Sequence, residues 1–432
     1  MSKRTFSLTH ALTGLFLVPF FCAHAGPSDQ SGIVQTAPSF WDQQYMLGDW
    51  GGERTRLEKE GIKFDINDIG DFQADVAGSQ THHATYFGRF RESMDIDFNR
   101  LSGFDGEFFE TAIWQYVPNL SGKYLGTNTL TSSIAGEDSV RIDQLWYQQG
   151  FADNMFKVKF GQIAAVNEFG ATDFFDILFN DELGYAPNTL FATKQPFSPA
   201  GKPGIILWGD LSDVTKGLYV KTGVFTAYHN AYSPDDHGFN YGNDFNYGAV
   251  GSFEIGYQEQ KTVYNGTYKA GVNFNGLAIY QNPATGQNYS GDYTAYFLAQ
   301  KTVYHPVDAQ GKLQLKKGLD LLLEFVTAPG DRNSLQDEVT LGGRYTGLIP
   351  GRDEDKVGFG FIYSKNGYAS SDAYLTANGR SLSGEATWEL DYQYNPSPWL
   401  SIQPDTQFIL NPGGDSSRSP IIVMGLRTIL RF

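Results

Sequence analysis

The sequence predicts an all-β fold, a transmembrane antiparallel β-barrel of about 16 strands preceded by a short N-terminal helix. Three observations predict it. Apolar and polar residues alternate with a period of two over many stretches. Aromatic residues make up 15% of the 432 residues and there are 49 glycines, which favours strands and turns over helices. The final stretch, "IIVMGLRTILRF", alternates in the same way and places Phe432 on its apolar side.

Residues 1–25 have the pattern of a secretory signal peptide. The basic "MSKR" is followed by the apolar "ALTGLFLVPFF" and by the small-residue site "AHA", which predicts cleavage between Ala25 and Gly26. The alternative is an uncleaved membrane anchor, which the shortness of the apolar run disfavours. Cys22 lies inside this segment, and "PFFC" lacks the small residue that usually precedes a lipidated cysteine.

The mature chain would therefore carry no cysteine, which excludes cysteine catalysis and thiolate metal sites. Loss of Lys3 and Arg4 leaves 30 basic residues against 48 acidic ones, a formal charge of −18. Such an acidic chain does not suit nucleic acid or an anionic membrane surface as a partner, and it argues weakly against an anion pore.

Residues 26–61 form an N-terminal polar segment that ends in a short helix. In "LGDWGGERTRLEKEGI" we expect Asp49 to cap a helix that runs to about Lys59, and Gly61 to stop it.

Residues 62–432 then alternate as one barrel domain, because no stretch in this range has the character of an interdomain linker. Roughly 407 mature residues, at about 25 for each strand and its turn, give about 16 strands. The clearest alternating stretches are "RFRESMDIDFN", "VRIDQ", "FKVKF", "TWELDYQYN" and "LSIQPDTQFIL".

A secreted β-sandwich or solenoid would alternate too. Two features favour a membrane barrel. The polar side of the strands holds opposite charges close together, as in Arg89 and Arg91 with Asp95 and Asp97, which suits a wet lumen. Aromatic residues such as Trp388 lie near strand ends on the apolar side, as in an interfacial girdle.

Several stretches resemble the OprB-type carbohydrate-selective porins of Gram-negative outer membranes. The similarity runs from about residue 45 to the C-terminus and is weak over about 225–310. It rests on "LGDWGGERTRLEKEGI", "LSGFDGEFFETAIWQYVPNLSGKYLG", "RIDQLWYQQGFADNMFKVKFGQIAAVNEF", "FNDELGYAP" and "WELDYQYNPSPWLSIQPDTQFILNPGG".

The resemblance implies a 16-stranded barrel with a narrow channel that passes glucose and other small neutral sugars by diffusion, without turnover and without a cofactor. It also implies contact with outer-membrane lipid. Phe432 looks like the C-terminal signal that the outer-membrane assembly machinery reads. Similar barrels occur as monomers and as trimers, and the oligomeric state stays open.

A sugar-selective lumen needs paired donors and acceptors for hydroxyl groups. Residues on the polar side of strands in the N-terminal half are the candidates for binding sugar. The alternative is that their charges brace the barrel wall. They are Arg89, Arg91, Asp95, Asp97, Arg141, Asp143, Lys157 and Lys159.

Residues 166–190 are rich in Phe and do not alternate. We hypothesise that this segment folds inward and narrows the pore; the alternative is an extracellular loop packed on the rim.

No catalytic or metal site is predicted. Glu107 and Glu110 lie three apart, so on a strand they point to opposite faces and cannot act together as in a glycosidase. His82 and His83 would also diverge. The charged stretches 235–237 and 352–356 are only weak calcium candidates. Neither a P-loop nor a G-x-S-x-G motif occurs.

Two other functions stay open. One is a general or cation-favouring outer-membrane pore. The other is a secreted all-β polysaccharide hydrolase or lyase.

Overall fold

The computed structural model describes residues 39–78, 82–116, 120–136, 138–172, 177–184, 188–228, 237–239, 241, 247–259 and 263–432. Ser39–Phe432 form one compact unit. The expected signal peptide, with Cys22 and the cleavage site, lies outside the described residues, as do Asp235 and Asp236.

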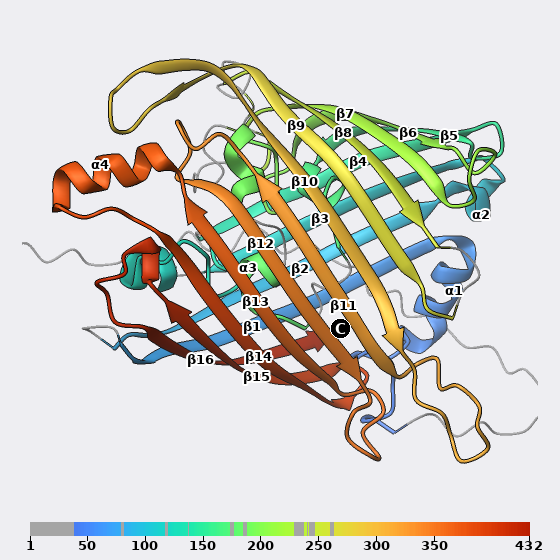
Figure 1. Cartoon of the computed structure of the whole chain (residues 1–432). Coiled ribbons are helices and arrows are strands. Elements are labelled where there is room, and N and C mark those ends of the chain that lie inside the picture. Colours follow the sequence, from blue (N-terminus) through green and yellow to red (C-terminus); the bar gives the residue numbers. More distant parts are fainter. Residues whose placement is uncertain are drawn as a thin grey trace, which may run out of the picture. The chain divides into compact units, whose positions relative to one another are not determined.

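Sixteen strands of the described chain pair in chain order, each antiparallel to the next, and β1 pairs with β16 to close the barrel (Figure 1). The predicted fold class is confirmed. The strands are β1 Ile62–Ala77, β2 Ala84–Asp97, β3 Gly106–Tyr116, β4 Ser139–Phe151, β5 Phe156–Ile163, β6 Lys202–Asp210, β7 Leu218–Thr226, β8 Ala249–Gln258, β9 Gly266–Gln281, β10 Asn288–Tyr304, β11 Gly318–Thr327, β12 Leu335–Thr346, β13 Lys356–Asn366, β14 Gly384–Ser397, β15 Leu400–Leu410 and β16 Ile421–Arg431.

The helices lie before β1 or in the connections between strands. None in the described ranges is long and apolar enough to cross a membrane. They are the α-helices α1 Glu53–Glu60, α2 Phe98–Ser102, α3 Asp181–Gly184 and α4 Tyr368–Asn378, and the short turns η1 Trp50–Gly52, η2 Ser121–Leu125, η3 Ala165–Asn167, η5 Asn188–Thr193 and η7 Pro412–Gly414.

The predicted N-terminal helix is present as α1, but its start was predicted wrongly. Gly51 and Gly52 have φ of 72° and 102°, so the α-helix begins only after them. Gly52, not Asp49, directly precedes the helix, but the carboxylate of Asp49 accepts a hydrogen bond of 2.8 Å from the amide of Thr55 in the first turn, as a capping side chain does. The predicted end is confirmed, because Gly61 has φ of 96° and closes the helix.

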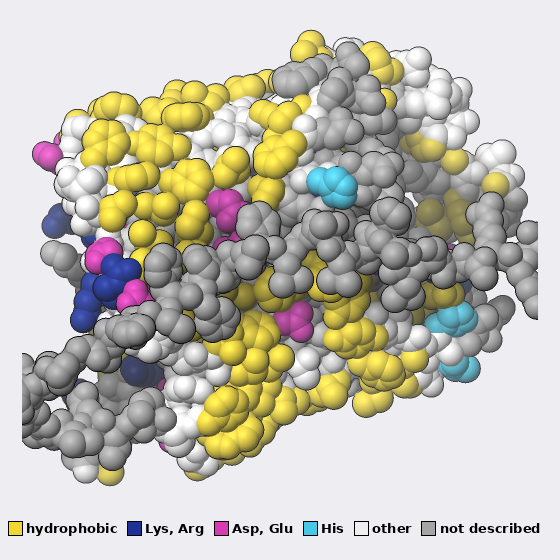
Figure 2. Space-filling view, turned by 180° about the vertical axis from the view of Figure 1, so that it is seen from behind, with side chains coloured by type: hydrophobic (Ala, Val, Ile, Leu, Met, Phe, Trp, Pro, Cys, Tyr) yellow, Lys and Arg dark blue, Asp and Glu magenta, His cyan; other side chains and the backbone are white. Residues whose placement is uncertain are grey.

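The two faces of the strands follow the predicted alternation. On β14, Glu389, Asp391 and Gln393 are buried inside the barrel while Leu390 is exposed on the outer wall. Figure 2 shows hydrophobic side chains covering much of the outer wall on one side, with a few acidic side chains among them. One expected face is wrong: β2 ends at Asp97, and Phe98 begins α2.

The two ends of the barrel differ in their connections. The end at which β1 begins carries α1 and the short connections 98–105, 152–155 and 398–399. The opposite end carries the long ones, 117–138, 164–201 and 367–383, the last of which includes α4 (Figure 1). In outer-membrane barrels the short turns are periplasmic and the long loops extracellular, so we assign the ends accordingly.

The C-terminus is held on the periplasmic side. The amide of Phe432 donates to the Ile66 carbonyl at 2.9 Å, and the guanidinium of Arg54 in α1 donates to the Phe432 carbonyl at 2.7 Å. The Phe432 ring lies 6.2 Å from the ring of Phe90. The Phe432 ring therefore lies on the outer face of the barrel, as its position on the apolar side of the final strand predicts.

Candidate functional site

Opposite charges gather on opposite parts of the inner wall. The buried acidic side chains of β11 to β15 are Glu324, Glu338, Glu385, Glu389, Asp391 and Asp405. The inward-facing basic side chains of β2 to β9 are Arg89, Arg91, Arg141, Lys157, Lys159, Lys202, Lys221 and Lys269. A solute that crosses the lumen therefore passes between the acidic side chains of β11 to β15 and a face of β2 to β9 on which basic side chains are mixed with carboxylates such as Asp95, Glu107 and Glu254.

The connection 164–201, here called the constriction segment, folds into the barrel rather than over its rim. Its described residues Phe169, Phe179 and Leu190 are fully buried. Wall carboxylates accept hydrogen bonds from its main chain: Glu254 from Gly170 at 2.9 Å, Glu389 from Asn180 at 3.0 Å and Glu338 from Thr189 at 2.6 Å. Such charge-assisted bonds are stronger than neutral ones, and they fix the segment to the wall.

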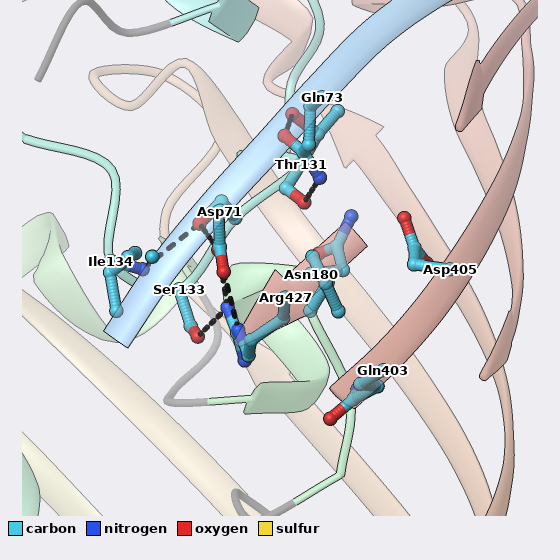
Figure 3. A network of polar contacts seen from close by, with 12 residues as sticks. Asp71, Gln73, Thr131, Ser133, Ile134, Asn180, Gln403, Asp405 and Arg427 are labelled. Carbon is cyan, nitrogen blue, oxygen red and sulfur yellow. Dashed lines mark hydrogen bonds and ion pairs between the residues drawn. The ribbon is translucent and has the colours of Figure 1, made fainter. Parts of the chain in front are cut away.

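A second connection enters the lumen beside it. The carboxylate of Glu385 accepts the amides of Asn128 and Thr129 at 2.9 and 3.1 Å. Nearer β1, the hydroxyl of Ser132 donates to Asp71 at 2.7 Å. Figure 3 shows the part of this connection nearest β1, where Arg427 reaches both Asp71 and Ser133.

Part of the inner wall is apolar, although the alternation in the sequence predicts a polar lumen throughout. Inward-facing Leu298, Leu322 and Ile362 pack with Ile177, Leu178 and Leu183 of the constriction segment. Phe225, Tyr296 and Val326 form a second such cluster with Phe169 and Leu190. The segment is thus held by burial of apolar surface as well as by hydrogen bonds.

Three adjoining cavities lie along the inner face of β1 to β7 beside this segment. The Trp208 cavity, of about 220 Å³, is lined by Gln148, Lys157, Lys159, Glu168, Ile206, Trp208 and Lys221. The Arg91 cavity, of about 200 Å³, is lined by Lys63, Asp65, Arg91, Ser93, Asp95, Phe109, Thr111, Asp143, Gln144, Asn167 and Ser198. The Glu107 cavity, of about 250 Å³, is lined by Asp95, Asp97, Asp105, Gly106, Glu107, Gln148, Gly150, Asn154 and Lys157.

The cavities share lining residues, so they adjoin along one polar stretch of the inner wall, here called the polar path. Lys157 and Gln148 line both the Trp208 and Glu107 cavities, and Asp95 lines both the Arg91 and Glu107 cavities. The path borders the constriction segment at Glu168 and Asn167 and reaches the periplasmic connections at Asp105 and Asn154.

Six of the eight predicted lumen residues line this path; Arg89 and Arg141 line none of the three cavities. Some of these six side chains also bind other residues of the protein. Asp97 caps α2 by accepting the Asn99 amide at 2.9 Å. Asp143 accepts from Ser198 at 2.5 Å and from the Gly201 amide at 3.2 Å. Lys159 forms an ion pair of 2.6 Å with Glu168.

The Trp208 cavity combines the chemistry that a sugar needs. Lys157 lies 5.2 Å from the Trp208 ring centroid, and Lys159 lies 3.6 Å from that of Trp146. Lysine and glutamine side chains donate to hydroxyl groups, Glu168 accepts from them, and an indole face suits the apolar face of a pyranose ring. Sequence reasoning missed Trp208, Glu168 and Lys221. Only Lys221 offered a signal, since it lies on the opposite parity to Val220 and Val224, whereas the stretch around Trp208 does not alternate.

The weaker candidates are settled by their partners. Glu107 lines a cavity while Glu110 lies on the outward parity of β3, as expected. His82 approaches Asp75 at 3.2 Å and the ring of His83 packs on Tyr124, so the two histidines diverge. In the 352–356 stretch, Asp355 accepts two hydrogen bonds of 2.8 Å from Arg352, so its carboxylate is paired with that guanidinium.

Solved structures show the same fold. The chain superimposes on the structure described as "High pH structure of Pseudomonas putida OprB" with a TM-score of 0.82 and 21% identity, over 91% of this chain and 100% of that one. The outer membrane channel DcaP of Acinetobacter baumannii gives a TM-score of 0.52 and 10% identity, over 86% and 97%.

Curated relatives cover nearly the whole chain. The Putative porin QuiX of Acinetobacter baylyi is 23% identical over 92% of this chain and 95% of its own length. Porin B of Pseudomonas aeruginosa is 22% identical over 89% and 91%. Residues 81–432 match the family described as "Carbohydrate-selective porin, OprB family". The chain therefore belongs to the OprB family of carbohydrate-selective outer-membrane porins, and it is a channel rather than an enzyme.

Proposed function

We propose that small neutral sugars such as glucose cross this barrel by facilitated diffusion along the polar path beside the constriction segment. The observation that carries the proposal is the Trp208 cavity, in which an indole ring lies among Lys157, Lys221 and Glu168. Donors, acceptors and an aromatic face together replace the water that a sugar gives up at a narrow point. The eight predicted lumen residues are proposed to act by lining or flanking this path.

Substitution at the cavity tests this assignment. Trp208→Ala should slow glucose entry into liposomes severalfold relative to wild type, while glycine entry stays unchanged, because only the sugar uses the indole face. Trp114→Ala is the matched control, since Trp114 is exposed on the outer wall. Equal slowing of glucose and glycine by Trp208→Ala would mean that the side chain affects pore width and not sugar recognition.

A cation-favouring pore is the second candidate. The Glu107 cavity carries Asp95, Asp97, Asp105 and Glu107 against a single lysine, so the periplasmic end of the path favours cations. The reversal potential across a bilayer in a potassium chloride gradient measures this preference. A large cation preference with no advantage for sugars would favour this candidate over sugar selectivity.

We also propose the route by which the chain reaches the membrane: cleavage after Ala25, then insertion guided by Phe432. In the folded barrel the main chain of Phe432 is hydrogen-bonded to Arg54 and Ile66, so these main-chain groups are free only before the barrel closes. Mass spectrometry of the mature N-terminus tests the cleavage site. Deletion of Phe432 should lower the amount of folded barrel in the outer membrane, where lipid covers the apolar wall.

A further inference from the structure

We propose that the barrel binds one calcium ion through Glu389 and Asp391 of β14 and Asp405 of β15, where the constriction segment meets the inner wall. One carboxylate oxygen from each of the three residues lies within 4.8 Å of the others. Asp391 and Asp405 are direct partners in the sheet, and Glu389 lies two residues earlier on the same inward face. All three side chains are buried, with 1–3% exposure.

The charges around this cluster do not balance. Arg427 lies on β16, next to β15, and both of its hydrogen bonds of 2.7 Å go to Asp71 on β1. In Figure 3 dashed lines join Arg427 to Asp71 but not to Asp405. The residues of the constriction segment that face the cluster, Ile177 to Asn180, are uncharged, and the next residue is Asp181. Among the described residues, the three cluster carboxylates and Asp71 therefore lie around the guanidinium of Arg427.

Two carboxylate oxygens of the cluster also have no hydrogen-bond donor. Asp391 Oδ2 and Asp405 Oδ1 are buried without a partner among the described residues. Their sister oxygens do have donors, since Gln403 donates to Asp391 at 2.8 Å and Gln407 to Asp405 at 3.3 Å. A buried, unpaired carboxylate oxygen is strongly unfavourable unless a cation or a proton compensates it. The unpartnered oxygens point to a ligand.

The donor set identifies the ligand as a hard divalent cation. The three residues offer only carboxylate oxygens, with neither histidine nor cysteine, which disfavours zinc and copper. Magnesium keeps several waters in a regular octahedron, and a site this buried has little room for them. Calcium accepts irregular sets of carboxylate and carbonyl oxygens, so it fits best.

The ion would connect to the pore through the same residues. Glu389 accepts the amides of Phe179 and Asn180, and Gln403 joins Asp391 to the Ile177 carbonyl. Calcium bound to these carboxylates therefore holds the constriction segment against β14 and β15. The site is independent of the route proposed for sugars, which follows the opposite wall.

Calorimetric titration of the purified barrel, freed of metal with EDTA, with calcium chloride tests the proposal. We expect one calcium per barrel, weaker binding of magnesium, and a higher thermal unfolding midpoint in calcium than in EDTA. The double variant Asp391→Asn with Asp405→Asn should lose the binding and the shift. Glu385→Gln is the control, because Glu385 is a buried carboxylate on the same face of β14 outside the cluster.

The outcomes are distinct. Calcium binding that the double variant loses and Glu385→Gln keeps supports the site. Absence of calcium binding by the wild-type barrel overturns it and indicates that protons shared among the carboxylates neutralise the cluster. Unchanged binding by the double variant also overturns it. If the double variant does not fold, Asp405→Asn alone should raise the dissociation constant at least about tenfold, and an unchanged constant would reject the proposal.

Discussion

Arg427 on the last strand donates two hydrogen bonds of 2.7 Å to Asp71 on the first strand, directly across the seam that closes the barrel. Both side chains are nearly inaccessible to solvent, and the guanidinium also lies 4.1 Å from the ring centroid of Phe179 in the constriction segment. One arginine therefore joins the first strand, the last strand and the segment inside the lumen (Figure 3).

Breaking this pair should weaken the barrel. Arg427→Met leaves Asp71 buried without its cation, and we expect a loss of about 3 kcal/mol or more in the free energy of unfolding. The double variant Arg427→Met with Asp71→Leu should recover part of that loss. Urea titration of folded barrel, followed by gel mobility, measures both. Equal destabilisation of the single and double variants would contradict a specific pairing across the seam.

Removing the inward-folded part of the constriction segment should widen the channel. Replacement of residues 166–190 by a short turn removes buried Phe169, Phe179 and Leu190 from the lumen. We expect single-channel conductance to rise severalfold. Shortening α4 and its connection, 367–383, is the control, because that connection lies at the extracellular end. An unchanged conductance after the first replacement would show that the segment does not limit the pore.

Acid should open the extracellular loops at Asp415. Burial raises the pKa of Asp415, but hydrogen bonds from Ser417, Tyr374 and Arg380 outweigh it and hold the pKa well below its usual range. Since the folded pKa is depressed, this stabilisation is present above the unfolded pKa of about 4 and is lost as pH falls below it.

Limited proteolysis between pH 6 and pH 2 with an acid-active protease measures this effect. In wild type, cleavage within 367–383 and 411–420 should increase as the pH falls. Asp415→Asn should be cleaved readily even at pH 6 and should change little with pH. The same pH dependence in the variant and in wild type would assign the effect to other groups.

Carboxylates on the outer wall should reduce stability. Glu92 lies on the outward parity of β2 between Phe90 and Met94, and Glu110 lies on the outward parity of β3, where it pairs with Met94 and shares a side-chain hydrogen bond with Glu92. Glu92→Leu should raise the free energy of unfolding in lipid by about 1 kcal/mol, since an acidic side chain facing hydrocarbon is unfavourable. Asp95→Leu, on the inward face of the same strand, should give no gain. A stability loss for Glu92→Leu would contradict this and would mean that the hydrogen bond between Glu92 and Glu110 outweighs the cost of the carboxyl group in hydrocarbon.

The sequence predicted the barrel because alternation persists over strands such as β2, β14 and β15. It was less clear in β11 and β13, and the structure gives the reason. Leu322 and Ile362 face inward but are apolar, because they pack against the constriction segment. A strand that is apolar on both faces has no period of two to detect.

For the candidate site, the sequence predicted which side chains face the lumen but not which residues they bind. Alternation sufficed to place Lys157 and Lys159 inward. It could not predict that Asp143 lies in a bulge, since Thr111 pairs with Gln144 and Ala112 with Ile142, or that it binds Ser198. Contacts of this kind depend on how a long connection returns into the lumen, which local periodicity does not encode.

Solute entry into liposomes tests the central claim most directly. Barrels reconstituted into liposomes are compared by swelling rate for glucose, a disaccharide and an amino acid of similar size to glucose. A sugar-selective lumen predicts faster entry of glucose than its size alone would give, and faster than that of the amino acid. Entry rates that follow size alone for all three solutes would contradict it and leave a general pore.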